Sequence, residues 1–484
     1  MFCIDVKSGR HVWMYEGKNI VHRTIALGPD RVFLIDSSIS SEQRAALLQQ
    51  DKQALKNLSA EQAQLAELRM KNLDARLAVA LDSRTGKELW SQPVDVTDCS
   101  EIGTGGGKLT LLYKNNTLLL CGANANGHYW KQFLSGEFSR RRLVALSAAD
   151  GNKMWARDAN YRHRPIVVED RIIAEPWAFD LYSGEQLTRS NPLTGQDEPW
   201  SLIRPGHHCG MLTGCPGMLM FRSGYTGFYD LKSDEGTRHF SGHRLGCWIN
   251  AIPANGLVMI PEASAGCVCL FSIASTITLE PRTSRRPWTL TSSVGATTPV
   301  QNMALNLGAP GDRKDALGTV WLAYPRPDPH KVTGLDLKLA LNEKLLPSGA
   351  FTSVNSRDLQ ILGTENSWIY ASAAHGMSEF RLPLIGKGQS AGVYTVKLHF
   401  AEMDDTPDAR SRRFSIKLQG QTVLQDFNIL EAAGKPLSVV VRQFDNLDVS
   451  RDLKVQMIPT LRAERPGDLP LLNAIEVQRT DGRR

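Results

Sequence analysis

The chain has 484 residues, of which 42% are hydrophobic and 22% are charged. This composition is that of a globular protein large enough for about three average domains, and it excludes a disordered or fibrous chain. The formal net charge of +6 is small for this length, and the basic residues are scattered. Nucleic acid and anionic membrane surfaces are therefore not indicated as partners, and no apolar run is long enough to span a membrane.

The first predicted element is a hairpin whose turn returns several times in the first half of the chain. The pattern D-x-x-[ST]-G-x-x-x-W occurs at residues 4–13 (IDVKSGRHVW) and 81–90 (LDSRTGKELW), and with Ser in place of Asp at residues 146–155. Two more eroded copies occupy residues 179–188 and 229–240. A unit that recurs in this way predicts a repeat architecture.

Each copy has the residues that a bulged β-hairpin needs. The Asp or Ser side chain accepts hydrogen bonds from backbone N–H groups of the turn, and the Gly supplies the positive φ of the loop. The Trp follows on the returning strand. Since a small sheet cannot bury its face alone, we expect these aromatic side chains to dock one hairpin against the next. The docking residues predicted in this way are Trp13, Trp90 and Trp155.

The segment from about residue 40 to 76 interrupts the strand pattern with a helical one. It is rich in Ala, Leu, Gln, Glu and Lys, and it contains two S-x-x-Q capping patterns, Ser40 with Gln43 and Ser59 with Gln62. Each pattern opens a helical run that carries leucines. We predict a helical hairpin inserted between two strands, and without it the first repeat interval shrinks to about 40 residues, the length of one four-stranded blade.

With these features the repeat resembles that of the PQQ-like β-propellers. This family includes quinoprotein dehydrogenases and an outer-membrane-assembly lipoprotein that uses the same ring as a scaffold. The resemblance covers residues 1–285 and implies a propeller, of which five or six blades can be counted where the family usually has seven or eight. We therefore expect an N-terminally incomplete propeller whose missing front carries the export signal, and hence a periplasmic or secreted protein.

The resemblance to quinoproteins also implies a possible chemistry. Those enzymes hold the quinone PQQ in the central funnel with a calcium ion, an aspartate base and a disulfide between two adjacent cysteines. This chain has no Cys-Cys pair. We expect no cofactor, and the alternative is a quinoprotein-type or metal-dependent oxidoreductase that uses the funnel and the cysteine-rich segment described next.

Five of the eight cysteines lie between residues 209 and 269. This clustering favours disulfides in the last blades, although the connectivity does not follow from the sequence. The candidates are Cys209, Cys215, Cys247, Cys267 and Cys269. A metal site is the alternative, with His239, His243 and Cys247 at positions i, i+4 and i+8. The glycines between them favour loops over a helix, and buried reduced thiols are the third possibility.

After residue 285 the pattern changes. Residues 282–299 have a Ser, Thr, Pro and Arg character, and residues 286–298 are predicted to be an interdomain linker. In the region 299–482, YTVKLHF (394–400) and FSIKLQG (414–420) alternate apolar and polar residues. Alternation of period two with frequent turn signals predicts an antiparallel β-sandwich.

Four segments of this second region resemble successive motifs of malectin-like carbohydrate-binding domains. They are MALNLGAPGDRKDALGTVWLAYPRP, YTVKLHFAE, FSIKLQGQTVLQDFNI and PLLNAIEVQR, in the order and at the distances of that family. The resemblance implies a jelly-roll-like β-sandwich that binds glycans through loop aromatic and polar side chains and has no catalytic machinery.

Within these motifs, the residue types that stack on sugar rings or bind hydroxyl groups are Asp312, Arg313, Trp321, Tyr324, Glu402 and Asn473. Trp368 and Tyr370 of the intervening loop complete the predicted carbohydrate site. Each of these side chains also has a structural alternative, in a turn or in the core. We expect a scaffold and binding protein that interacts with carbohydrate and with cell-envelope proteins. The alternatives are the oxidoreductase and a purely structural interaction protein.

Overall fold

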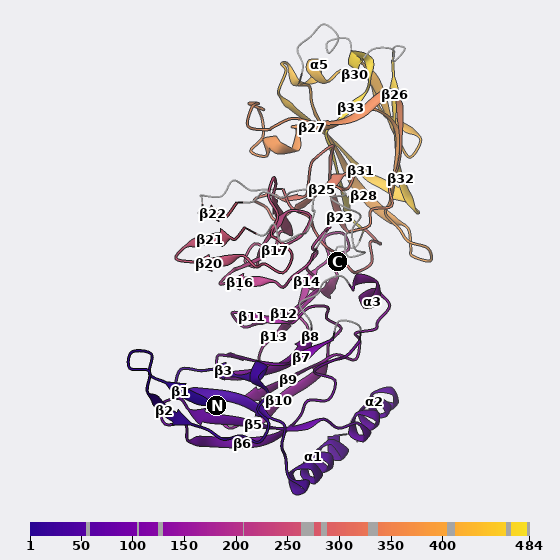
Figure 1. Ribbon diagram of the computed structural model, residues 1–484. Helices are drawn as coiled ribbons and strands as arrows, with labels where there is room; N and C mark the ends of the chain where they lie inside the picture. The colour runs from indigo at the N-terminus through magenta and orange to yellow at the C-terminus, as the bar shows by residue number, and fades with distance from the viewer. Residues whose placement is uncertain are drawn as a thin grey trace. The chain divides into compact units, whose positions relative to one another are not determined.

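The structure is a computed structural model (Figure 1) that describes the chain except for residues 55–58, 104–105, 124–128, 207, 263–274, 282–287, 328–336, 404–411, 461–465 and 482–484. It consists mostly of β-strands, and its contacts divide it into two compact units. The repeat unit comprises Met1–Leu187, Trp200–Lys232 and Phe240–Pro281. The sandwich unit comprises Thr188–Pro199, Ser233–His239 and Arg282–Arg484. The sequence predicted one boundary near residue 285, whereas two earlier segments are grouped here with the sandwich.

The repeat unit is a succession of small antiparallel sheets. The first two are β1 (Phe2–Ile4) with β2 (His11–Met14), and β3 (Ala26–Leu27), β4 (Arg31–Asp36), β5 (Ala75–Asp82) and β6 (Glu88–Asp95). The next two are β7 (Gly106–Lys114), β8 (Thr117–Ala123), β9 (Arg142–Ser147) and β10 (Lys153–Asp158), and β11 (Ile166–Val168), β12 (Arg171–Ala174) and β13 (Trp177–Asp180). The last two are β16 (Thr213–Cys215), β17 (Met218–Arg222) and β18 (Thr226–Asp230), and β20 (Ile252–Ala254), β21 (Leu257–Ile260) and β22 (Ile277–Leu279). The short helices η1 (His22–Thr24) and α3 (Trp130–Leu134) lie in connections, and β19 (Thr237–Phe240) spans the boundary between the units.

Consecutive sheets of the repeat unit pack against one another. The first strands of successive sheets, β3, β7, β11, β16 and β20, contact each other in chain order, as can be followed in Figure 1. The cores lie between neighbouring sheets: Phe33 and Ala80 of one sheet share a buried cluster with Leu111 and Leu120 of the next. Each small sheet thus buries its face on its neighbour, which is the blade packing that a repeat of this kind predicts.

The recurring turn is held by its Asp and its Gly. In the copy at residues 81–90, the Asp82 carboxylate accepts hydrogen bonds from the backbone N–H groups of Arg84 (3.0 Å) and Thr85 (2.7 Å). Gly86 has φ +70° and donates its N–H to the Asp82 carbonyl (2.9 Å). Residues with a Cβ rarely adopt this φ, so the turn requires glycine.

The same glycines lie against the tryptophan of the preceding copy. A Cβ added to Gly86 would lie 2.7 Å from the Trp13 ring, and one added to Gly151 would lie 2.6 Å from the Trp90 ring. The indole N–H groups donate to backbone carbonyls of the following turn or strand end. These bonds join Trp13 to Ser83 (3.0 Å), Trp90 to Ala148 (3.1 Å) and Trp155 to Leu181 (3.1 Å). The three tryptophans therefore lie between consecutive hairpins.

A helical hairpin interrupts one sheet between β4 and β5, as the capping patterns predict. α1 (Ser41–Ala54) begins after Ser40, and α2 (Ala60–Lys71) begins after Ser59, whose side chain forms a capping box with Gln62. The base of the hairpin is fixed to the sheet by Leu47, which is buried beside Leu73.

A buried group of charged residues lies near β11–β13 in the repeat unit. The carboxylate of Glu175 accepts hydrogen bonds from Nε of Arg204 (3.0 Å) and from the Arg162 guanidinium. Arg204 also donates to the carbonyls of His208 (3.0 Å) and Gly210 (3.2 Å). Burial by itself raises the pKa of Glu175, but the charges of Arg204 and Arg162 outweigh it and hold that pKa below its ordinary value. These side chains connect loops at the ends of the thin sheets.

The sandwich unit contains two sheets packed face to face. The first sheet has the order β24 (Arg313–Lys314), β25 (Val320–Tyr324), β23 (Asn302–Leu307), β34 (Ala474–Arg479), β28 (Gly392–Ala401) and β31 (Val439–Val449). The second has the order β26 (Asn342–Ser353), β27 (Ser372–Pro383), β32 (Asp452–Pro459), β29 (Phe414–Leu418) and β30 (Gln421–Phe427), with β33 (Leu471–Leu472) paired to β27. The unit also contains the hairpin β14 (Thr188–Ser190)–β15 (Asp197–Pro199) and the short helices η3 (Ser367–Ile369), α5 (Ile429–Ala433) and η4 (Pro466–Asp468).

The alternating residues of the sandwich form its core, as their spacing predicts. Tyr394 and Phe400 of β28 and Phe414 of β29 are fully buried in one large apolar cluster between the sheets. Side chains one position away on the same strands point to the opposite face, because successive residues of a strand alternate sides. The outer face of the first sheet is therefore free to carry other groups.

The described part of the predicted linker, residues 288–298, packs on the sandwich unit together with the β14–β15 hairpin. Glu198 of the hairpin accepts hydrogen bonds from the Ser293 hydroxyl (2.9 Å) and the Gly295 N–H (2.8 Å). Leu193 at the hairpin's tip is buried in the sandwich core, and its carbonyl accepts the N–H of Gln301 (2.7 Å). These contacts explain why the hairpin is grouped with the sandwich and not with its neighbours in sequence.

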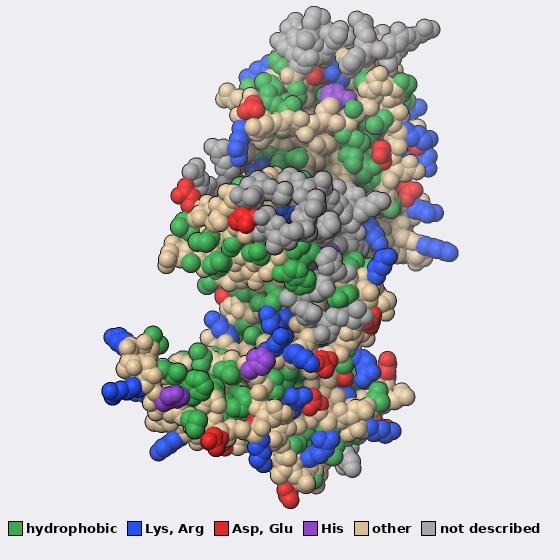
Figure 2. Space-filling model, in the orientation of Figure 1, with side chains coloured by type: hydrophobic (Ala, Val, Ile, Leu, Met, Phe, Trp, Pro, Cys, Tyr) green, Lys and Arg blue, Asp and Glu red, His purple; other side chains and the backbone are tan. Residues whose placement is uncertain are grey.

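On the face drawn in Figure 2, basic and acidic side chains are interspersed on both units. Among the described residues, no helix has both the length and the apolar composition needed to cross a membrane.

Candidate functional site

The aromatic residues predicted to bind sugar form a buried cluster on the outer face of the first sheet. Trp321 and Trp368 meet edge to face with ring centroids 6.2 Å apart, and Trp288 packs on Trp368 at 5.9 Å. The indole N–H of Trp321 donates to the Asp315 carboxylate (3.1 Å). Only 4% of Trp321 and 6% of Trp368 is exposed. The two rings pack against each other and are almost fully buried. Contact of either ring with a sugar remains a prediction.

Asp312 and Arg313 support the same cluster. The fully buried carboxylate of Asp312 accepts the backbone N–H groups of Thr291 (2.8 Å) and Ala323 (2.9 Å). It thereby ties the segment before the sandwich to β25. The Arg313 guanidinium lies over the Trp368 ring, 4.8 Å from its centroid, as in a cation–π contact.

Tyr324, Glu402 and Asn473 are also buried and take part in hydrogen bonds within the unit. Glu402 accepts from Nε of Arg412 (2.7 Å), and the Asn473 side-chain oxygen accepts the backbone N–H of Ala401 (2.8 Å). Among the eight predicted carbohydrate-binding residues, Arg313 alone is more than slightly exposed. The eight therefore do not line an open site.

A polar cavity of about 620 Å³ lies over the outer face of the first sheet, within the sandwich unit. Strands β23, β34 and β28 form its floor. The turn of the β14–β15 hairpin and the loop between β24 and β25 contribute to its walls, together with Asp234 and Thr291. Its size is within the range of about 300–1,000 Å³ that is typical of small-molecule sites.

The floor of the polar cavity consists of two rows of side chains that lie opposite one another across three strands. Register and alternation place all of them on the same face. The rows are Ala304–Glu476–Lys397 and Asn302–Gln478–Thr395. Five of these six side chains are polar. The sixth, Ala304, is short and leaves space beside Glu476 in the cavity floor.

A chain of hydrogen bonds runs from the aromatic cluster to the cavity floor. The Tyr370 hydroxyl lies 2.8 Å from Nδ1 of His399, and Nε2 of His399 lies 2.8 Å from the Glu476 carboxylate. With a proton on Nε2, His399 donates to the Glu476 carboxylate, and its ring links the aromatic cluster to the cavity floor. Lys397 lies 3.7 Å from the other Glu476 oxygen.

These contacts determine the charge state of the floor. Burial by itself raises the pKa of Glu476, but the hydrogen bond and charge of His399 and the charge of Lys397 lower it below its ordinary value. The pKa of Tyr370 is raised, mainly by burial and further by the charge of Glu476. Glu476 is therefore an anionic acceptor at neutral pH, held in place from two sides.

One wall of the cavity is a further copy of the recurring turn. Asn191 stands at the Asp position, and its side-chain oxygen accepts the N–H groups of Leu193 (2.9 Å) and Thr194 (3.0 Å). Gly195 has φ +68°. A search for the pattern D-x-x-[ST]-G-x-x-x-W does not find this copy. Asn replaces the Asp, and Trp200 follows Gly195 by five residues where the pattern has four. The pattern N-x-x-T-G was the signal that could have found it.

The charges around the cavity are of both signs. Arg189 lies 3.8 Å from Asp234 in the wall, as Lys397 lies 3.7 Å from Glu476 in the floor. Lys314 adds a further cation, and amide and hydroxyl groups lie between the charges. The cavity thus offers hydrogen-bond donors and acceptors to a neutral polar ligand.

The structure does not support the predicted disulfides or the metal alternative. No disulfide joins two of the described cysteines, which include Cys209, Cys215 and Cys247, while Cys267 and Cys269 lie outside the described residues. In the described part of the chain, no group of three or more His, Cys, Asp or Glu side chains is arranged to hold a metal ion. His239 lies on the strand β19, so a helical alignment with His243 and Cys247 does not form.

The comparisons with known proteins match each unit separately. Residues 325–475 match the family model of the malectin domain, and residues 74–213 match that of the outer membrane protein assembly factor BamB. No match to a curated protein was found.

Among solved structures, the chain is similar to the ANXUR2 extracellular domain from Arabidopsis thaliana, with 18% identity over 37% of this chain and 41% of that chain and a TM-score of 0.27. It is also similar to a calcium-binding mutant of β-glucuronidase 2 from Bacteroides uniformis, with 11% identity over 53% and 27% of the two chains and a TM-score of 0.30. These TM-scores are too low to support an argument. The chain spans less than half of the ANXUR2 domain.

The two family matches define the class of the protein. The chain contains a BamB-type repeat of the PQQ-like propellers and a malectin domain, and its all-β fold is a propeller-type repeat followed by a β-sandwich. Both predicted resemblances are confirmed. They indicate a binding or scaffold role.

Proposed function

We propose that the sandwich unit binds carbohydrate in the polar cavity and that the repeat unit is a scaffold for protein interaction in an extracytoplasmic setting. The observation that carries the carbohydrate proposal is the cavity itself, with about 620 Å³ of space over a floor of polar side chains. The match of residues 325–475 to the malectin domain supports it. The match to an outer membrane assembly factor supports the scaffold role and the setting.

The chemistry of the floor suits a sugar. Each hydroxyl group of a sugar both donates and accepts hydrogen bonds, and it is bound best where donors and acceptors lie side by side. Lys397 and the amides of Asn302 and Gln478 offer donors, and Glu476 offers an anionic acceptor. The ion pairs within the cavity leave little net charge, which favours a neutral saccharide over a strongly charged ligand.

The test is a glycan array probed with the whole protein, followed by calorimetry with the glycan that binds best. Glu476→Gln and Lys397→Ala are expected to weaken binding by roughly tenfold each, because each removes a charge-assisted hydrogen bond. Both side chains are partly exposed, so the variants are expected to fold. Trp368→Ala and Tyr324→Ala are poorer tests, since these residues are buried and their loss destabilises the unit.

A matched control exists on the second sheet. Lys454 lies 3.3 Å from Glu379, on β32 and β27, in a pair that resembles Lys397–Glu476 but does not line the polar cavity. Lys454→Ala and Glu379→Gln are expected to leave glycan binding unchanged. The proposal fails if no glycan binds, or if the control variants weaken binding as much as the cavity variants.

The proposed extracytoplasmic location is tested separately, by fractionating cells that express the gene. Recovery of the protein outside the cytoplasm is expected, and recovery only in the cytoplasm would contradict this part of the proposal.

A further inference from the structure

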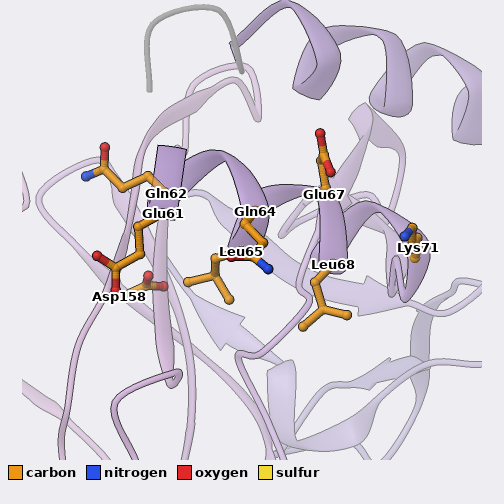
Figure 3. Close-up of a pocket in the computed structure, with 8 residues that line it drawn as sticks. All are labelled: Glu61, Gln62, Gln64, Leu65, Glu67, Leu68, Lys71 and Asp158. Atoms are coloured by element: carbon orange, nitrogen blue, oxygen red, sulfur yellow. The ribbon is translucent and has the colours of Figure 1, made fainter. Parts of the chain in front are cut away.

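The repeat unit has a hollow of its own along the helix α2, with a volume of about 650 Å³. It is lined by residues of α2 and by Asp158 at the end of β10. Figure 3 shows Leu65 and Leu68 on one side of the helix and the carboxyl groups of Glu61 and Asp158 close to each other. Neither family match gives a role to this helix, since α2 precedes both matched segments.

Four of the seven residues of α2 that line the hollow lie in one stripe. Glu61, Leu65, Leu68 and Lys71 are spaced i, i+4, i+7 and i+10, which brings them into one stripe. None of the residues of α2, all of which are described, is buried, and 41% of Leu68 is exposed. A leucine stripe on a helix normally packs against another element. Here it faces the hollow.

Arg69 fixes α2 to the sheets. Nε of Arg69 donates to the Asp98 carboxylate (2.7 Å), and its guanidinium also bonds to Asp158. The capping box of Ser59 and Gln62 secures the first turn. The leucine stripe is therefore presented by a helix that is already anchored, which lowers the entropy lost when a partner binds.

The charge around the stripe indicates what could cover it. Three carboxyl groups, those of Glu61, Glu67 and Asp158, line the hollow against one ammonium group, that of Lys71. Asp158 is paired with Arg69, whereas among the described residues Glu61 and Glu67 form no ion pair. The hollow is thus acidic in a chain whose formal net charge is +6.

We propose that this face of α2 binds an amphipathic helix of a partner protein that carries Lys or Arg beside its apolar stripe. The partner's apolar side chains pack on Leu65 and Leu68, in the manner of a helix laid into a groove. Its cations lie over Glu61 and Glu67, where opposite charges favour encounter and register.

The experiment uses the whole protein and a labelled synthetic helix of about 18 residues, long enough to be helical alone. The probe has leucines at i, i+3 and i+7 and lysines beside them, and the comparison peptide has glutamate in place of every lysine. Fluorescence anisotropy is expected to give at least roughly tenfold tighter binding for the lysine peptide. Raising the salt from about 0.15 M to about 1 M shortens the screening length from about 8 Å to about 3 Å, and it is expected to weaken that binding.

Variants locate the binding on the protein. The double variant Glu61→Lys, Glu67→Lys is expected to weaken the lysine peptide by at least roughly tenfold, and Leu68→Gln by severalfold. Glu88→Lys and Leu89→Gln are the matched controls, because they change an exposed Glu and an exposed Leu of β6 that do not line the hollow. The controls are expected to bind like the unaltered protein.

Three outcomes would overturn the proposal. The first is that the lysine peptide does not bind, or binds no tighter than the glutamate peptide. The second is that Glu88→Lys weakens binding as much as the double variant. The third is self-association of the protein, measured by sedimentation, that the double variant abolishes, since the face would then be covered by a second copy of this chain.

Discussion

Both units consist mainly of antiparallel strands, with the parallel pair β23 and β25 in the sandwich, yet the ion pairs of Glu175 and of Glu379 differ in burial. In the repeat unit, Glu175 and its partners Arg162 and Arg204 are nearly inaccessible to solvent. In the sandwich unit, Glu379 forms its ion pairs with Lys454 and Arg381 at the surface. Thin stacked sheets bring many loop carbonyls together at their ends, and buried carbonyls need donors. Arginines supply them in the repeat unit, and in the sandwich unit the buried Arg412, paired with Glu402, donates to the Leu469 carbonyl in the same way.

The largest expected effect comes from breaking the buried group. Glu175→Ala leaves two arginines buried without their anion and is expected to lower the free energy of unfolding by about 3–5 kcal/mol. Glu379→Ala in the sandwich removes pairs whose partners, Lys454 and Arg381, lie at the surface, and it is expected to lower the free energy of unfolding by about 0–1 kcal/mol. Urea unfolding of the two variants side by side measures both. Equal losses would contradict the difference drawn between the buried ion pairs of Glu175 and the more exposed ones of Glu379.

The recurring turn gives a second comparison, since the same position is exposed in one copy and buried in another. Asn191 donates through its amide to the buried carboxylate of Glu198 (2.8 Å). Asn191→Asp places a second carboxylate beside Glu198 and is expected to lower the free energy of unfolding by about 3 kcal/mol. The variant loses the amide hydrogen bond and also brings two like charges together in a buried place. Asp82→Asn changes an exposed turn and is expected to stay within about 0.5 kcal/mol. Thermal unfolding at neutral pH distinguishes the two.

A third comparison tests the contact between glycine and tryptophan. Gly151→Ala introduces a Cβ at a positive φ and pushes it against the Trp90 ring, whereas Gly9 has the same kind of φ and open space around it. Gly9→Ala is expected to cost about 1–2 kcal/mol from the backbone alone. Gly151→Ala is expected to cost roughly 1 kcal/mol more, as the packed tryptophan must shift. If both variants melt at the same temperature, the Trp90 contact contributes nothing.

A pH-dependent effect on stability is expected from His375 in the sandwich. Burial, together with the charge of Arg412, lowers its pKa from 6.5 to about 4. The unfolded chain therefore takes up the proton first as the pH falls, and the folded state loses stability between about pH 6.5 and pH 4, by at most about 1.4 kcal/mol per pH unit. Below about pH 4 both states are protonated and this loss ends.

His375→Gln isolates that contribution, because His208 and His243, whose pKa values are also lowered, remain in both proteins. Above pH 7 the unfolding free energies of the two proteins should run parallel. Between pH 6.5 and pH 4.5, the unfolding free energy of the unaltered protein should fall more steeply with falling pH than that of the variant. Parallel curves in this range would show that His375 does not couple folding to pH.

Much of the fold was predictable because its signals are local. The turn of Asp82 and Gly86 depends on hydrogen bonds within five residues, and it repeats visibly. The helical hairpin follows from Ser59 and Gln62, which form the capping box that their spacing predicts. The alternation from Tyr394 to Phe400 predicts a strand with one buried face, and that face is buried.

The candidate site was less predictable because it is assembled from distant segments. The floor of the polar cavity pairs Glu476 with Lys397, and the wall comes from Asn191, nearly three hundred residues earlier. The sequence drew attention to Trp321 and Trp368, since aromatic residues suit sugars. In the fold these rings pack on each other, and the polar side chains next to them border the open space.

By itself, the amino-acid sequence determined the repeated hairpins, the inserted helices and the two faces of the sandwich strands. Each of these depends on backbone conformation, capping or periodicity over a few residues. Only the tertiary structure decided which side chains are buried together and which surround a cavity. Strand register and the packing of loops set those distances, and neither is encoded within a short stretch of sequence.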